Sequence, residues 1–126
     1  MATIGTHYIL TALGGAKARG LDTKALLKKA RIPEKPLKDP KARFHVDLVA
    51  RLYAGIAQEL NDEFMGFTQN PIKVGTFELM ADWVSHSTTL EELLQKGIRF
   101  YNQITDEVQV SLEVEDEHVY FTSTFK

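Results

Sequence analysis

The chain has 126 residues and no cysteine, which is the size of a single domain and excludes a disulfide framework, a thiolate zinc site and cysteine catalysis. Apolar residues make up 44% and charged residues 25% of the sequence, as in soluble globular domains, so a disordered or fibrous chain is excluded. The net charge of −2 averages two unlike regions: residues 17–43 hold ten basic and three acidic side chains, and the remainder holds five basic and fourteen acidic ones.

The first residues show neither a basic segment followed by an apolar run nor a small-residue cleavage site. No apolar run in the sequence approaches the length of a membrane span. The absence of cysteine agrees with a reducing compartment. We therefore expect a cytoplasmic protein without a membrane partner.

The first half of the chain is predicted to be mainly helical. Apolar residues recur at helical spacing over residues 6–19, and Gly20 is placed to stop this helix. Asp22 is expected to cap a short basic helix that ends before Pro33. The clearest amphipathic pattern covers residues 46–60 and predicts a third helix.

Two more helices are predicted in the second half of the chain. The first covers residues 76–85, and the second runs as far as about Ile104. Ser87 or Thr88 is expected to cap the second of them. The spacing Thr88-x-x-Glu91 matches a capping box, in which the two side chains each accept a hydrogen bond from the other residue's backbone.

After Asp106 the apolar period changes from helical to two. Apolar and polar residues alternate on both sides of a turn at Asp116-Glu117, which predicts an antiparallel hairpin with one buried face: Val108, Val110, Leu112, Val114, Val119, Phe121, Ser123 and Phe125. A lone hairpin is marginally stable in water, so we expect it to be part of an incomplete sheet in a truncated domain. The predicted fold class is α+β, with about five helices followed by an antiparallel β-hairpin.

No arrangement typical of catalysis or metal binding is found. The histidines at positions 7, 45, 86 and 118 lack the spacing that lets two imidazoles share a metal ion. The sequence also lacks a nucleophile elbow, a Ser/His/Asp set and the glycine spacing of a phosphate loop. We therefore expect no enzyme, no catalytic residue, no metal and no cofactor.

Two features favour a binding function. Residues 20–33 form a capped, basic, alanine-rich segment like the first helix of a helix-turn-helix, although prolines interrupt the stretch where a recognition helix should lie. Aromatic and methionine residues gather on the two helices before the hairpin. They could pack a core or line a pocket for a small ligand, and the candidate ligand-binding residues are Phe77, Met80, Trp83 and Tyr101.

Several segments, taken in order, resemble a known family. They are Gly20-Leu21-Asp22, Ala25-Leu26-Leu27, Asp39-Pro40-x-x-Arg43-Phe44, Gly75-Thr76-Phe77-Glu78-Leu79-Met80, Ser87-Thr88-Thr89-Leu90-x-Glu92-Leu93-Leu94 and Arg99-Phe100-Tyr101. Followed by the acidic hairpin, this succession resembles the N-terminal, arabinose-binding-like sensor domain of AraC-type transcription regulators. The resemblance covers almost the whole chain.

The resemblance implies that residues 1–126 form an effector-sensing regulatory domain of a bacterial transcription regulator. A small-molecule effector would bind this domain and control DNA binding by a C-terminal domain with two helix-turn-helix units, which these residues do not contain. DNA would be a partner only through that domain, and a homodimer is left open. The alternative is a small stand-alone DNA-binding or protein–protein interaction module that uses the basic segment 17–43.

Overall fold

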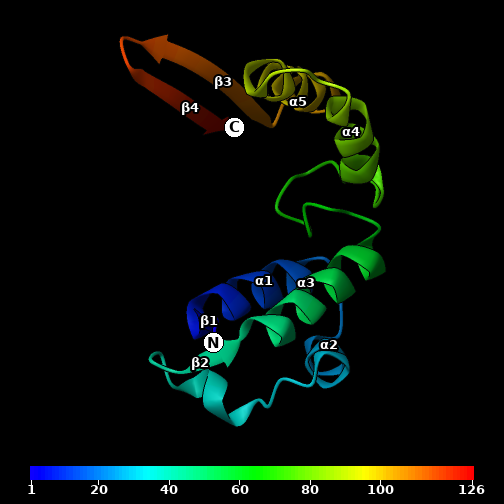
Figure 1. The fold of residues 1–126 in the computed structure, drawn as a ribbon. Coiled ribbons are helices and arrows are strands. Elements are labelled where there is room, and N and C mark those ends of the chain that lie inside the picture. Colours follow the sequence, from blue (N-terminus) through cyan, green and yellow to red (C-terminus); the bar gives the residue numbers. More distant parts are fainter. The chain divides into compact units, whose positions relative to one another are not determined.

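The computed structural model describes residues 1–126 and divides them into two compact units, Met1–Val74 and Gly75–Lys126. The first unit holds three α-helices and a pair of short strands, and the second holds two helices and a long β-hairpin (Figure 1). The predicted α+β class, with five helices followed by an antiparallel hairpin, is confirmed.

Three helices build the core of the first unit: α1 Thr6–Ala18, α2 Thr23–Ala30 and α3 Val46–Leu60. Each presents an apolar stripe at helical spacing, and the stripes pack against one another. Alanines stand among larger aliphatic side chains at the buried positions of α1 and α2, which lets the helices pack closely. The core consists of Ile9, Ala12, Leu13, Ala16, Leu26, Leu27, Ala30, Ile32, Phe44, Val49, Leu52 and Ile56.

The ends of these helices follow from local side-chain chemistry. The Asp22 carboxylate caps α2, as predicted, by accepting the N–H groups of Lys24 and Ala25 at 3.0 and 3.2 Å. The C-cap residues that follow α2 and α3 are Arg31 and Asn61, with φ angles of 61° and 48°. A residue in this left-handed conformation lets the following chain bond the last helical carbonyls and leave the helix axis.

The first unit also contains short elements that the sequence pattern did not predict. They are the strands β1 Thr3–Gly5 and β2 Arg43–His45, which pair antiparallel with Ile4 opposite Phe44, and the 3-10 helix η1 Lys35–Lys38. Three residues are too few to show an alternation, and the pairing joins segments that are distant in the sequence. Tertiary packing around the buried Phe44 therefore decides these strands rather than local propensity.

A buried carboxylate organises the loop that follows α3. The Asp62 side chain is 2% exposed and accepts three backbone N–H groups, from Phe64 at 3.0 Å, Gly66 at 2.8 Å and Ile72 at 2.9 Å. Gly66 has φ +79°, and a Cβ atom there would lie 3.1 Å from Cγ of Arg19. The Asp62 side chain thus ties three points of the loop together, the Arg19 guanidinium adds a bond to the Thr68 carbonyl, and the loop needs glycine at position 66.

The second unit begins with two helices that pack against each other, α4 Thr76–Ser85 and α5 Leu90–Ile104. The predicted capping box is displaced by one residue, because α5 begins at Leu90 with Thr89 as its N-cap. The Thr89 hydroxyl accepts the N–H of Glu92 at 3.1 Å, so the assignment of Thr88 as the cap and Glu91 as its partner is wrong.

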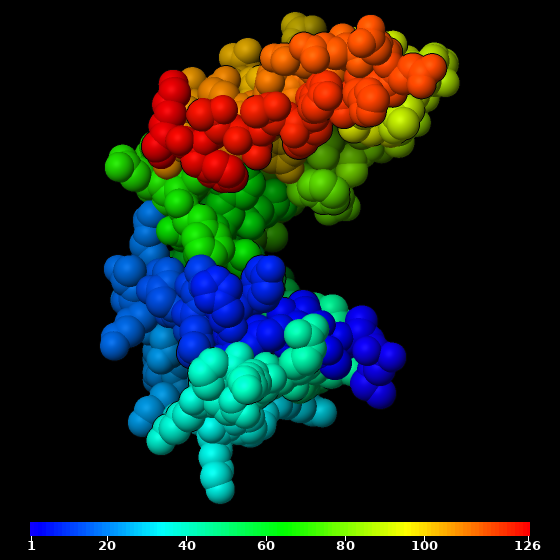
Figure 2. Space-filling model, turned by 90° about the vertical axis from the view of Figure 1, so that its left-hand side faces the viewer, coloured from blue at the N-terminus to red at the C-terminus, as the bar shows by residue number.

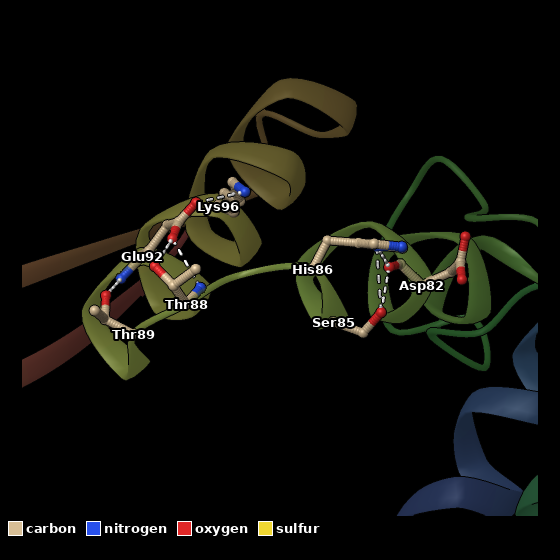
Figure 3. Close-up of polar contacts among 7 residues, drawn as sticks. All are labelled: Asp82, Ser85, His86, Thr88, Thr89, Glu92 and Lys96. Atoms are coloured by element: carbon tan, nitrogen blue, oxygen red, sulfur yellow. Dashed lines mark hydrogen bonds and ion pairs between the residues drawn. The ribbon is translucent and has the colours of Figure 1, made fainter.

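The Glu92 carboxylate completes the start of α5 (Figure 3). It accepts hydrogen bonds from the N–H of Thr88 at 3.0 Å and from the Thr88 hydroxyl at 3.2 Å. It also forms an ion pair with the Lys96 ammonium at 2.7 Å. The bond from Lys96, followed by the two from Thr88, lowers the pKa of the Glu92 carboxyl from 4.5 to about 2.

This depressed pKa predicts how stability depends on pH. The unfolded chain takes up a proton at Glu92 more readily than the folded one, so folded-state stabilisation is present above pH 4.5 and is lost as the pH falls toward about 2. The difference in melting temperature between the wild type and Glu92→Gln should therefore shrink over this window, as measured by circular dichroism. Glu91→Gln is the matched control, because Glu91 bonds the neutral amide of Gln95. A difference that stays constant with pH would contradict the assignment.

The hairpin joins β3 Val108–Glu115 to β4 His118–Phe125 through the predicted two-residue turn, where Asp116 has a positive φ of 52°. The register places Leu112 opposite Phe121, so the apolar residues of both strands share one face. The prediction that this face is buried is correct only in part. Helix α5 packs against β3, whereas β4 is exposed along its whole length and lies at the surface in Figure 2, in red.

Candidate functional site

The second unit contains a groove of about 460 Å³ between its helix pair and the apolar face of the hairpin. Its volume falls within the range of about 300–1,000 Å³ that is typical of small-molecule sites. The lining residues come from α4, α5, β3 and β4: Phe77, Met80, Ala81, Val84, Ser85, Leu93, Leu94, Gly97, Ile98, Tyr101, Val110 and Phe121.

The groove arises from the helical spacing of the two stripes that line it. On α4 and on α5 the lining residues recur three or four positions apart, so each stripe faces the other helix. Gly97 of α5 faces Met80 of α4, where a Cβ atom would lie 3.7 Å from the methionine sulfur. The helices therefore approach closely at this point, and the hairpin adds Val110 and Phe121 to the opposite wall.

Three of the four candidate ligand-binding residues lie at this groove. Phe77, Met80 and Tyr101 line it, and Phe77 is 58% exposed despite its apolar ring. Trp83 is not among the lining residues. The centroid of its ring lies 6.4 Å from the centroid of the Phe100 ring and 5.9 Å from the Lys96 ammonium. A ligand role for each of the four stays a prediction.

Sequence reasoning did not place the remaining wall of the groove. The stripe on α5 was visible as helical periodicity, but periodicity alone does not distinguish a core from a cavity wall. Val110 and Phe121 join the groove because of the hairpin's position against α5, which no local pattern specifies. The aromatic residues around Trp83 are easily found in the sequence. They do not by themselves indicate a binding site, because bulky rings occur both in cores and in pockets.

Charged side chains are absent from the wall of the groove. Ser85 and Tyr101 carry its only side-chain hydroxyl groups. The Ser85 hydroxyl donates to the backbone carbonyl of Asp82 at 2.6 Å, and His86 Nδ1 lies 2.9 Å from the same carbonyl (Figure 3). The groove therefore offers extensive apolar contact and few hydrogen-bonding groups.

Asn102 ties α5 to the hairpin strand that lines the groove. Its amide nitrogen donates to the carbonyl of Val110 at 2.7 Å, and its amide oxygen accepts the N–H of Val110 at 2.8 Å. This pair of bonds imitates the pairing of a neighbouring strand on the outer edge of β3. One side chain thus connects the last turn of α5 to a strand that lines the groove.

Removing this side chain should loosen the hairpin. We expect Asn102→Ala to lower the free energy of unfolding by about 2 kcal/mol, because both backbone groups of Val110 lose their partner. Urea denaturation measures the loss, and hydrogen exchange of the Val110 amide locates it. Gln103→Ala, at an exposed neighbouring position, is the control and should be nearly neutral. Unchanged protection of the Val110 amide would contradict this role.

Other sites weighed from the sequence have a different geometry. No group of three His, Asp or Glu side chains is placed to hold a metal ion. Helix α2 is followed by the 3-10 helix η1, where a helix-turn-helix would place its recognition helix. None of the helices combines the length and apolar character needed to span a membrane.

The comparisons with known proteins place the chain in a family. The family model for the arabinose-binding domain of AraC transcription regulators, N-terminal, matches residues 20–126. The match runs from just before α2 to the end of the chain and includes every residue that lines the groove. The chain therefore belongs to this family, and the resemblance stated from the sequence is confirmed. Neither the comparison with curated proteins nor that with solved structures found a match.

Proposed function

We infer that this protein is the effector-sensing part of an AraC-type transcription regulator, and that a small molecule binds in the groove between α4, α5 and the hairpin. The bound effector favours one of two arrangements of the regulator and thereby controls DNA binding by a C-terminal helix-turn-helix domain. The protein carries out no chemistry on the effector. Phe77, Met80 and Tyr101 contact the ligand. Trp83 lies outside the groove lining, against Phe100.

The observation that carries this proposal is the groove itself. It joins an exposed aromatic ring, a buried methionine and the open apolar face of a hairpin in one concave surface. Ligand sites in proteins are concave and mostly apolar, with a small number of polar groups. Membership of a family of sensor domains supports the same assignment.

Thermal unfolding with a panel of metabolites tests the proposal. A ligand that binds only the folded protein stabilises it by about 2.7 kcal/mol at a hundredfold excess over its dissociation constant. We expect at least one class of compound to stabilise the protein by about this free energy and so to raise its melting temperature. A panel that spans sugars, amino acids, aromatic acids and neutral apolar compounds and produces no shift would contradict effector binding.

The alternative of a stand-alone nucleic-acid module rests on the exposed lysines of α2 and η1. The Asp22 and Asp39 carboxylates in this region bind backbone N–H groups, and the Lys29 ammonium lies 3.5 Å from Glu59. We expect no retarded band when residues 1–126 are mixed with duplex DNA at low salt, where binding driven by phosphate contacts should be strongest, because η1 stands in place of a recognition helix. A complex that forms and weakens steeply with added salt would favour the alternative.

A further inference from the structure

The wall of the groove indicates what kind of molecule it holds. Ten of its residues present only hydrocarbon, thioether or backbone atoms, and the two others are Ser85 and Tyr101. No lysine, arginine, histidine, aspartate or glutamate lines it. A ligand in this groove therefore meets a largely apolar surface and no countercharge.

A sugar suits such a wall poorly. A monosaccharide carries a hydroxyl group on nearly every carbon atom, and each one buried without a hydrogen-bond partner weakens binding. The Ser85 hydroxyl already donates to the Asp82 carbonyl, which leaves its oxygen only as an acceptor toward a ligand. A carboxylate or ammonium group would lose its hydration without gaining an ion pair.

We propose that the groove binds an uncharged small molecule whose bulk is hydrocarbon, and that it discriminates against sugars although the family model is named for arabinose. This inference rests on the proposed function, because it assumes that the groove is the effector site. The occupant is a small molecule, because the groove volume of about 460 Å³ lies within the range of small-ligand sites and its wall is concave and almost wholly apolar.

Fluorescence titration with N-phenylnaphthylamine, a neutral apolar dye that brightens in apolar sites, tests the proposal on residues 1–126. We expect saturable binding with one dye per chain, displacement by decanol, and no displacement by L-arabinose at a hundredfold higher concentration. Decanoate is a third competitor, and we expect it to bind more weakly than decanol because no cation lines the groove.

Two phenylalanines of β4 provide a matched pair of variants. Phe121 and Phe125 are 60% and 74% exposed on the same face of the strand, but only Phe121 lines the groove. Threonine is a good strand residue, so neither substitution should unfold the hairpin. We expect Phe121→Thr to weaken dye binding about fivefold and Phe125→Thr to change it less than twofold.

The possible failures are distinguishable. If L-arabinose displaces the dye or stabilises the chain while decanol does not, the ligand class is wrong and the effector site stands. Dye binding that responds equally to both variants, or that appears only in a dimer detected by sedimentation, overturns the apolar small-molecule site. If neither decanol nor any compound of the metabolite panel stabilises the protein, the proposed function fails as well.

Discussion

Replacing Ala81 with phenylalanine should remove effector binding from a protein that is still folded. Ala81 is half-buried on α4 and lines the groove, so a phenyl ring at this position occupies the space of the ligand. If the affinity falls a hundredfold, the stabilisation at a fixed effector concentration drops from about 2.7 to about 0.4 kcal/mol. Thermal unfolding with and without the best compound of the metabolite panel measures this difference.

Asp82→Phe is the control for this experiment. It adds the same ring to the next position of the same helix, where the side chain is exposed and lies outside the groove. We expect it to retain the full effector-induced shift. Equal loss of the shift in both variants would mean that a bulky ring on α4 disturbs the unit generally. Retention of the shift by Ala81→Phe would place the effector elsewhere.

The largest effect on folding is expected at Asp62. In Asp62→Ala three backbone N–H groups, those of Phe64, Gly66 and Ile72, lose their buried acceptor. A buried donor left without a partner costs about 1–3 kcal/mol, so we expect a total loss of about 3 kcal/mol after partial rehydration of the loop. Urea denaturation followed by circular dichroism measures it, and hydrogen exchange of the three amides shows whether the loop has opened.

Asp62→Asn tests whether the loop needs both carboxylate oxygens or only a side chain of this size and shape. One oxygen can still accept the N–H groups of Phe64 and Ile72, but an amide nitrogen then faces the N–H of Gly66. We expect an intermediate loss and faster exchange at Gly66 alone. Glu34→Ala, at an exposed position, should change stability by less than about 0.5 kcal/mol. Equal stability of Asp62→Ala and the wild type would show that the loop does not depend on this side chain.

Helices and the hairpin could be predicted because their signals are local. The amphipathic period of α3, the Asp22 cap and the alternation around Asp116 each depend on residues close together in the sequence. The capping box at α5 was displaced by one residue because Thr88 and Thr89 are chemically equivalent caps. Which of the two threonines is the cap depends on the residue at which the helix starts, and the structure places that start at Leu90.

Features that depend on distant segments could not be predicted. The three-residue pairing of β1 with β2 joins residues about forty positions apart, and no pattern in either segment announces it. The alternation in β4 predicted a buried face, but burial requires a covering element, and α5 packs chiefly against β3 and leaves β4 exposed. Phe77 and Met80, which composition singled out, line the groove together with Phe121, which enters it through the hairpin register.

The central claim is that a small effector occupies the groove of the second unit, and the methionine methyl groups test it most directly. The chain has three methionines: Met80 lines the groove, Met65 packs against the core of the first unit, and Met1 is fully exposed. In a protein labelled with ¹³C at these methyl groups, a stabilising compound should shift the NMR signal of Met80 and leave those of Met65 and Met1 in place. A compound that stabilises the protein and shifts Met65 or Met1 while Met80 stays unchanged would contradict the account.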